Sequence, residues 1–113
     1  MKLPVIGFVG MSHLGLNYAV ATASKKFKVI CYDKNITTIN LLKKKVSPIF
    51  EKNLEKNIKL NFSNLIFTNN ISELKDCDNV YISEDVSTKI SGESDLITTK
   101  KLIDKTIKHL NKN

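Results

Sequence analysis

The sequence contains no arginine and no tryptophan, although 18 of its 113 residues are lysine. Lysine presents a point charge instead of the planar fork of arginine, so the chain is poorly equipped to read guanine edges or to clamp phosphates bidentately. The net charge of +7 therefore indicates a solvated basic surface, or attraction of an anionic nucleotide. No pattern of interleaved aromatic and basic residues accompanies the charge, so we expect no nucleic-acid partner.

Cysteines and long apolar runs are also scarce. Cys31 and Cys77 have neither a CxxC partner nor a histidine at metal-ligand spacing, which argues against a disulfide framework and a metal site. Both lie in apolar stretches that suit a buried thiol, and we expect a cytoplasmic protein. No segment approaches the ~20 apolar residues of a membrane span. Ser12, His13 and Asn17 interrupt the one segment that imitates a secretory signal peptide.

Short apolar strands alternate with helical segments along the chain. Strands are expected at residues 3–9, 27–33, 65–68 and 79–83, and helices at 14–23, 36–45, 49–58, 70–75 and 95–110, with a polar loop at 84–94. This alternation predicts an α/β protein with a Rossmann-like, doubly wound parallel sheet of about four strands in three α/β/α layers. The length suits one domain and is too short for two, so residues 1–113 are expected to form a single domain.

A glycine-containing turn follows the first expected strand. Its sequence, Gly10-Met11-Ser12-His13-Leu14-Gly15, has glycine at the outer positions of the dinucleotide fingerprint and serine at the middle one. The fingerprint needs a tight turn, a small residue where the backbone approaches the pyrophosphate, and glycine where the helix packs on the strand. The amides of Ser12, His13 and Leu14 then face the pyrophosphate. A second register starting at Gly7 would bury the turn inside the strand, and we reject it.

An acidic residue ends the second expected strand. Asp33 lies 18 residues after Gly15, where a carboxylate can accept hydrogen bonds from the ribose hydroxyls of the adenosine half. The same carboxylate would repel a 2′-phosphate, which favours NAD over NADP. We include the adjacent Lys34 among the cofactor contacts. For His13, lining the cofactor phosphates is favoured over a solvent-facing position or a part in the chemistry.

Later segments carry a more specific pattern. The stretch Ser47-Pro48-Ile49-Phe50-Glu51-Lys52-Asn53-Leu54 resembles the Pro-Ile-Tyr-Glu-Pro-Gly-Leu segment of the UDP-glucose/GDP-mannose dehydrogenase family. Residues 10–16, 29–33, 65–70, 77–82 and 92–96 are similar to further segments of that family, in the same order. Lys52 and Asn53 replace Pro-Gly, a mild change because asparagine tolerates a left-handed backbone.

The resemblance implies the NAD-binding domain of an enzyme that oxidises the C6 alcohol of a nucleotide sugar to a carboxylate. It also implies that Ser83, followed here by Glu84 and Asp85, lies where the family contacts the cofactor after the fourth strand. The family's catalytic cysteine and substrate-binding residues lie in later segments, so neither Cys31 nor Cys77 inherits the nucleophile's role. We therefore assign no catalytic residue, and we expect a monomer, because family members dimerise through a later helix.

Two alternatives stay open. A stand-alone or degenerate Rossmann module would bind a nucleotide or a protein partner without chemistry, because Ser12 and the pair Glu84 and Asp85 lie where the cofactor is expected. The related hydroxyacid dehydrogenases begin with a Gly-Phe-Ile-Gly sequence similar to residues 7–10, but the Pro-Ile-Phe-Glu segment argues against them.

Overall fold

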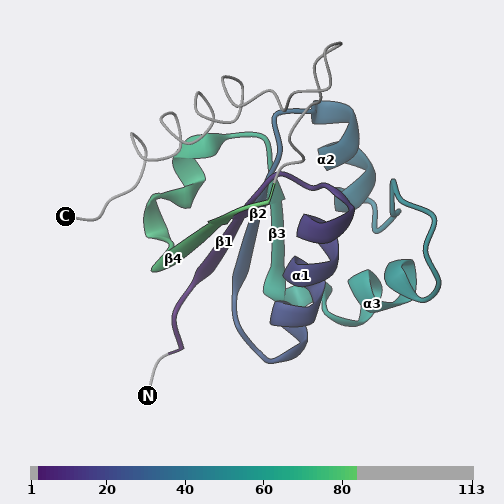
Figure 1. Ribbon diagram of the computed structural model, residues 1–113, viewed down its shortest axis with the longest axis horizontal. Helices are drawn as coiled ribbons and strands as arrows, with labels where there is room; N and C mark the ends of the chain where they lie inside the picture. Colours follow the sequence, from purple (N-terminus) through teal and green to yellow (C-terminus); the bar gives the residue numbers. More distant parts are fainter. Residues whose placement is uncertain (1–2, 84–113) are drawn as a thin grey trace, which may run out of the picture.

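The computed structural model describes residues 3–83 (Figure 1). Its elements in chain order are β1 (Ile6–Val9), α1 (His13–Ser24), β2 (Val29–Tyr32), α2 (Ile36–Lys43), α3 (Leu54–Leu60), the 3-10 helix η1 (Phe62–Asn64), β3 (Leu65–Thr68), the 3-10 helix η2 (Ile71–Asp76) and β4 (Asn79–Ile82). The predicted loop at 84–94 and the predicted helix at 95–110 lie outside the described residues.

The four strands form one parallel sheet in the order β3-β2-β1-β4. The chain first builds outward from β1 through β2 to β3, and then returns through η2 to place β4 on the other side of β1. Helices α1, α2 and α3 lie on one face and η2 lies on the other (Figure 1). The strand order therefore reverses between β1 and β4, and doubly wound sheets bind ligands at such a reversal.

Alternate strand residues build two separate cores. On the helix face, Phe8 and Cys31 belong to a cluster that includes side chains of α1, α2 and α3. On the opposite face, Val9 and Tyr32 pack with Leu74 and other side chains of η2. Because both faces of the central strands are covered, these strands appear in the sequence as continuous apolar runs.

Both cysteines are buried, as expected from their apolar neighbours, and neither forms a disulfide with another described residue. Burial, with a smaller contribution from Cys77, raises the pKa of the Cys31 thiol far above its ordinary value. A thiol of this kind stays protonated and is a poor nucleophile. No helix within residues 3–83 is long and apolar enough to cross a membrane.

The predicted helix at 49–58 is wrong over its first part. The helix begins only at Leu54, and Phe50, which shares a spacing of four with Leu54, is fully exposed. Asn53 has a φ of 66°, so the backbone turns sharply just before α3. This is the left-handed conformation that asparagine tolerates in place of the family's glycine. The predicted helix at 70–75 forms as the 3-10 helix η2, and the first two strands are shorter than predicted.

Gly7 leaves no room for a side chain on the η2 face of the sheet. A Cβ atom there would lie 2.8 Å from the Sγ of Cys77 and 3.1 Å from a methyl carbon of Leu74. We predict that Gly7→Ala lowers the free energy of unfolding by about 1–3 kcal/mol in urea denaturation, as overpacking does. In a Cys77→Ala background the same change should cost less, because the nearest atom is gone. An equal cost in both backgrounds would show that the clash is not the cause.

Candidate functional site

The carboxyl ends of β1, β2 and β4 meet at one edge of the sheet, and the site residues predicted from the sequence lie along this edge. They are Gly10 after β1, Ser12, His13, Leu14 and Gly15 at the start of α1, Asp33 and Lys34 after β2, and Ser83 after β4. This edge includes the point between β1 and β4 where the strand order reverses.

The two glycines of the turn meet different requirements. Gly10 has a φ of 100°, and its N–H donates to the carbonyl oxygen of Tyr32 at 2.8 Å, which joins the turn to the end of β2. Gly15 lies directly against this turn, because a Cβ atom on it would be 2.2 Å from the carbonyl oxygen of Gly10 and 2.5 Å from the Oγ of Ser83. These are the tight turn and the close helix–strand contact that the fingerprint needs.

Ser12 occupies the middle position of the fingerprint, and its side chain turns back toward the protein. The Oγ atom accepts a hydrogen bond from the N–H of Gly15 at 3.1 Å and donates one to the carbonyl oxygen of Ser83 at 2.5 Å. Its φ of −69° and ψ of 174° are ordinary extended values, which is why serine is tolerated here. Ser12 therefore caps α1 and connects it to the end of β4.

Ser83 completes this connection from the other side. Its Oγ lies within hydrogen-bond distance of the carbonyl oxygens of Gly10 and Val9, at 3.0 and 3.2 Å. The end of β4 is thus held against the turn by side chains from both partners. This network places Ser83 beside the first turn of α1.

The amino end of α1 can receive an anion. The helix has 12 residues and no acidic side chain in its first turn. His13 and Leu14 are the first two residues of the helix, so no carbonyl of a preceding turn is available to accept from their N–H groups. Both residues are exposed. With the positive end of the helix dipole, such amides suit a phosphate group.

Asp33 shapes the same turn. Its Oδ2 accepts from the N–H of Met11, and its Oδ1 accepts from the N–H of Asn35, both at 2.8 Å. Sequence reasoning missed the role of Met11, because a backbone amide leaves no signature in the residue type. A carboxylate has about four acceptor positions, so Asp33 can accept further hydrogen bonds from a ribose. Lys34 is exposed next to it.

A polar cluster that was not predicted lies beside the turn. The Nε2 of His13 is 2.6 Å from the Oε2 of Glu51, and the side-chain amide of Asn17 donates to the same oxygen at 2.8 Å. The hydrogen bond from Asn17 is the largest cause that holds the pKa of the Glu51 carboxyl below its ordinary value. Partial desolvation opposes it, and the hydrogen bond and charge of His13 lower the pKa further. The structure thus directs one ring nitrogen of His13 to Glu51.

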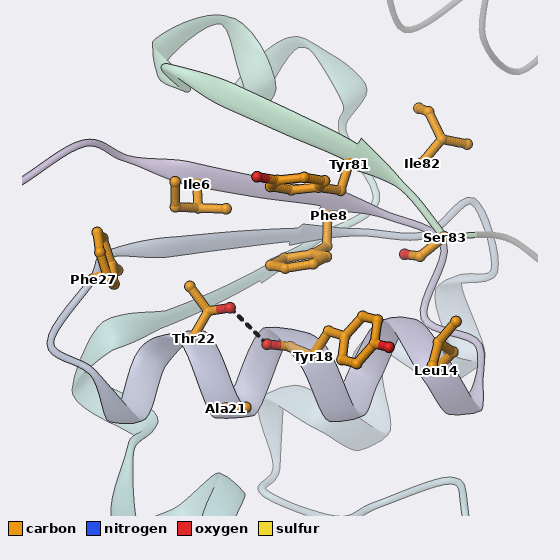
Figure 2. A pocket seen from close by; sticks show the side chains of 10 residues that line it. All are labelled: Ile6, Phe8, Leu14, Tyr18, Ala21, Thr22, Phe27, Tyr81, Ile82 and Ser83. Atoms are coloured by element: carbon orange, nitrogen blue, oxygen red, sulfur yellow. Dashed lines mark hydrogen bonds between the residues drawn. The ribbon is translucent and has the colours of Figure 1, made fainter.

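An apolar groove of about 520 Å³ runs along α1 on its β4 side (Figure 2). The rings of Phe8 and Tyr81 stack in it with centroids 5.5 Å apart. Tyr18 and Tyr81 are more than half exposed, at 55% and 56%. Leu14 and Ser83 line the end of the groove at the turn, and Phe27 lines it far from them (Figure 2). The groove therefore opens next to the turn but is a separate surface.

Comparisons with known proteins agree with this geometry. The model of the UDP-glucose/GDP-mannose dehydrogenase family, NAD binding domain, matches residues 4–113. The UDP-glucose 6-dehydrogenase of Rickettsia typhi is 34% identical over 110 residues, which are 95% of this chain and 25% of that protein. The UDP-glucose 6-dehydrogenase TuaD of Bacillus subtilis is 36% identical over 110 residues, which are 94% of this chain and 24% of that protein.

Two solved structures confirm the Rossmann-like fold. A ternary complex of GDP-mannose dehydrogenase from Pseudomonas aeruginosa has a TM-score of 0.85 at 24% identity, over 89% of this chain and 24% of that chain. A UDP-glucose dehydrogenase from Pyrobaculum islandicum has a TM-score of 0.87 at 21% identity, over 93% of this chain and 25% of that chain. The chain thus spans about a quarter of the length of these relatives.

Removal of the Ser12 hydroxyl tests the cap. We predict that Ser12→Ala lowers the free energy of unfolding by about 1 kcal/mol, the usual cost of losing an N-cap side chain. Ser24→Ala is the matched control, because its hydroxyl lies at the other end of α1 and, within residues 3–83, donates to the carbonyl oxygen of Ala21 alone. Equal unfolding energies for the two variants in urea denaturation would contradict the role of Ser12.

Proposed function

This chain belongs to the UDP-glucose/GDP-mannose dehydrogenase family, and we propose that it binds NAD at the turn between β1 and α1. The observation that carries the proposal is the meeting of the Gly10–Gly15 turn, the amino end of α1 and the Asp33 carboxylate at one edge of the sheet. The pyrophosphate then lies against the first turn of α1, and Asp33 accepts hydrogen bonds from the adenosine ribose.

The other candidate residues have supporting parts in this proposal. The N–H groups of Ser12, His13 and Leu14 donate hydrogen bonds to the pyrophosphate. These backbone amides take the place of arginine side chains, which the chain lacks. Lys34 adds a positive charge near the anionic cofactor. Ser83 holds the turn and borders the route from the pyrophosphate toward β4, where the nicotinamide ribose is expected.

The redox chemistry belongs to the cofactor, which accepts a hydride when it is bound. The residues of this chain bind and orient it. We propose that the domain serves the oxidation of a nucleotide sugar at C6 as part of a longer dehydrogenase, because curated relatives about four times as long are UDP-glucose 6-dehydrogenases. The burial of Cys31 and Cys77 supports the assignment of no catalytic residue to this chain. We also propose a cytoplasmic location, no nucleic-acid partner and a monomeric state for this chain.

A second candidate function is the binding of a protein partner without chemistry, and the apolar groove favours it. Exposed apolar patches on soluble domains commonly mark contact surfaces. β4 has no buried residue, whereas β1 is buried throughout. The side chains of β4 are therefore available for contact with a partner. In this case NAD at millimolar concentration would leave the melting temperature unchanged.

Asp33→Asn tests the cofactor site. We predict that the wild type gains about 2.7 kcal/mol of stability at a hundredfold excess of NAD over Kd, with a matching rise in melting temperature. Loss of the charged acceptor should weaken NAD binding by calorimetry about tenfold or more, since a hydrogen bond to a charged group contributes about 1.5–3 kcal/mol.

The matched control is Asp76→Asn, which removes the same charge beside the amino end of β1. It should bind NAD as the wild type does. Equal NAD affinities for Asp33→Asn and the wild type would show that this carboxylate is not on the ribose. No stabilisation of the wild type by NAD would contradict the proposed function as a whole.

A further inference from the structure

The segment of residues 44–53, between α2 and α3, passes beside the amino end of α1, and Glu51 makes its polar contacts there. Its Oε2 atom lies 2.6 Å from the Nε2 of His13 and accepts a hydrogen bond from the side-chain amide of Asn17 at 2.8 Å. His13 and Asn17 are four residues apart, so they share one face of α1 in successive turns. Among residues 3–83, these are the hydrogen bonds that join the segment to α1.

The other side-chain hydrogen bonds of the segment within residues 3–83 do not involve α1, and Ile49 packs against the core on the helix face. The N–H of Ser47 donates to Glu55 at 3.1 Å, and the Ser47 hydroxyl bonds with the backbone of Ile49. Asn53, with its left-handed φ of 66°, then reverses the chain before Leu54 enters the core. The backbone is therefore held before Glu51 by the Ser47 contacts and after it by the turn at Asn53. These contacts set the direction from which the Glu51 carboxylate reaches α1.

The first turn of α1 faces the apolar groove on one side and the segment of residues 44–53 on the other. Leu14 lines the groove on the β4 side, together with Ser83. His13 points to Glu51, on the segment that leads into α3, so its ring does not cover the turn on the β4 side. The N–H groups of these same two residues are the ones that the proposed function assigns to the pyrophosphate. A movement of the first turn would therefore misdirect both amides.

We infer that Glu51 is a positioning residue for cofactor binding, because it holds His13 and Asn17 so that the first turn of α1 presents its amides to the pyrophosphate. The contact is at the surface, with 65% of the His13 and 37% of the Glu51 side chain exposed. Exposed ion pairs contribute little to global stability, so its effect is expected in affinity more than in folding. The inference rests on the proposed function, namely NAD binding at this turn.

The test compares NAD affinity by calorimetry in the wild type, Glu51→Ala and Glu51→Gln. Glu51→Ala removes the acceptor and should raise the Kd about fivefold, since a hydrogen bond is typically worth a factor of a few in an equilibrium constant. Glu51→Gln keeps an oxygen that can accept from both donors, so it should restore the affinity to within about twofold of the wild type. Urea denaturation should give nearly equal unfolding energies for all three.

Glu55→Ala is the matched control. It removes the same kind of side chain from the first turn of α3, where the carboxylate accepts from the N–H of Ser47 instead of from a residue of α1. Its NAD affinity should equal that of the wild type. If the wild type binds NAD and Glu51→Ala binds it as tightly, this inference alone is overturned. A wild type that does not bind NAD overturns the proposed function and this inference with it.

Discussion

The close contact between α1 and the end of β1 is the constraint on which the rest of this structure depends. Gly15 has no side chain, and the helix therefore rests on the carbonyl oxygen of Gly10 and on Ser83, where even one methyl group would lie 2.2 Å from the backbone. At this separation the amino end of α1 points at the reversal between β1 and β4. The Ser12 hydroxyl then fixes the turn by donating to the carbonyl oxygen of Ser83, which follows β4. The Asp33 carboxylate fixes it by accepting from the N–H of Met11.

Serine at the middle of the fingerprint changes how the turn is held, but it does not change its path. The extended backbone of Ser12 is open to any residue, and its hydroxyl takes up the N–H of Gly15. The remaining amides of the first turn keep their direction. An anion-binding site made of backbone amides needs no arginine, which agrees with a chain whose basic residues are all lysine.

The parts of the fold that could be predicted from the sequence depend on local patterns. Short apolar runs predicted the four strands, and the Gly10 and Asp33 that follow the first two predicted the turn and the acidic residue at the sheet edge. The spacing of Phe50 and Leu54 predicted a helix that begins too early. The left-handed backbone at Asn53 separates these two residues, so they do not lie in one continuous helix. The contact between His13 and Glu51 spans 38 residues, and it follows from the path of the chain between α2 and α3, which no local pattern contains.

The central claim is that this chain holds NAD at the turn between β1 and α1, and residue-resolved NMR tests it most directly. The amide resonances of the isotope-labelled protein would be followed while NAD is added. The account predicts that the largest shift changes occur at residues 12–14 and at residues 33–35, with small changes at Tyr18 and Tyr81 in the groove. Changes that gather along the groove and leave the turn unaffected would contradict it.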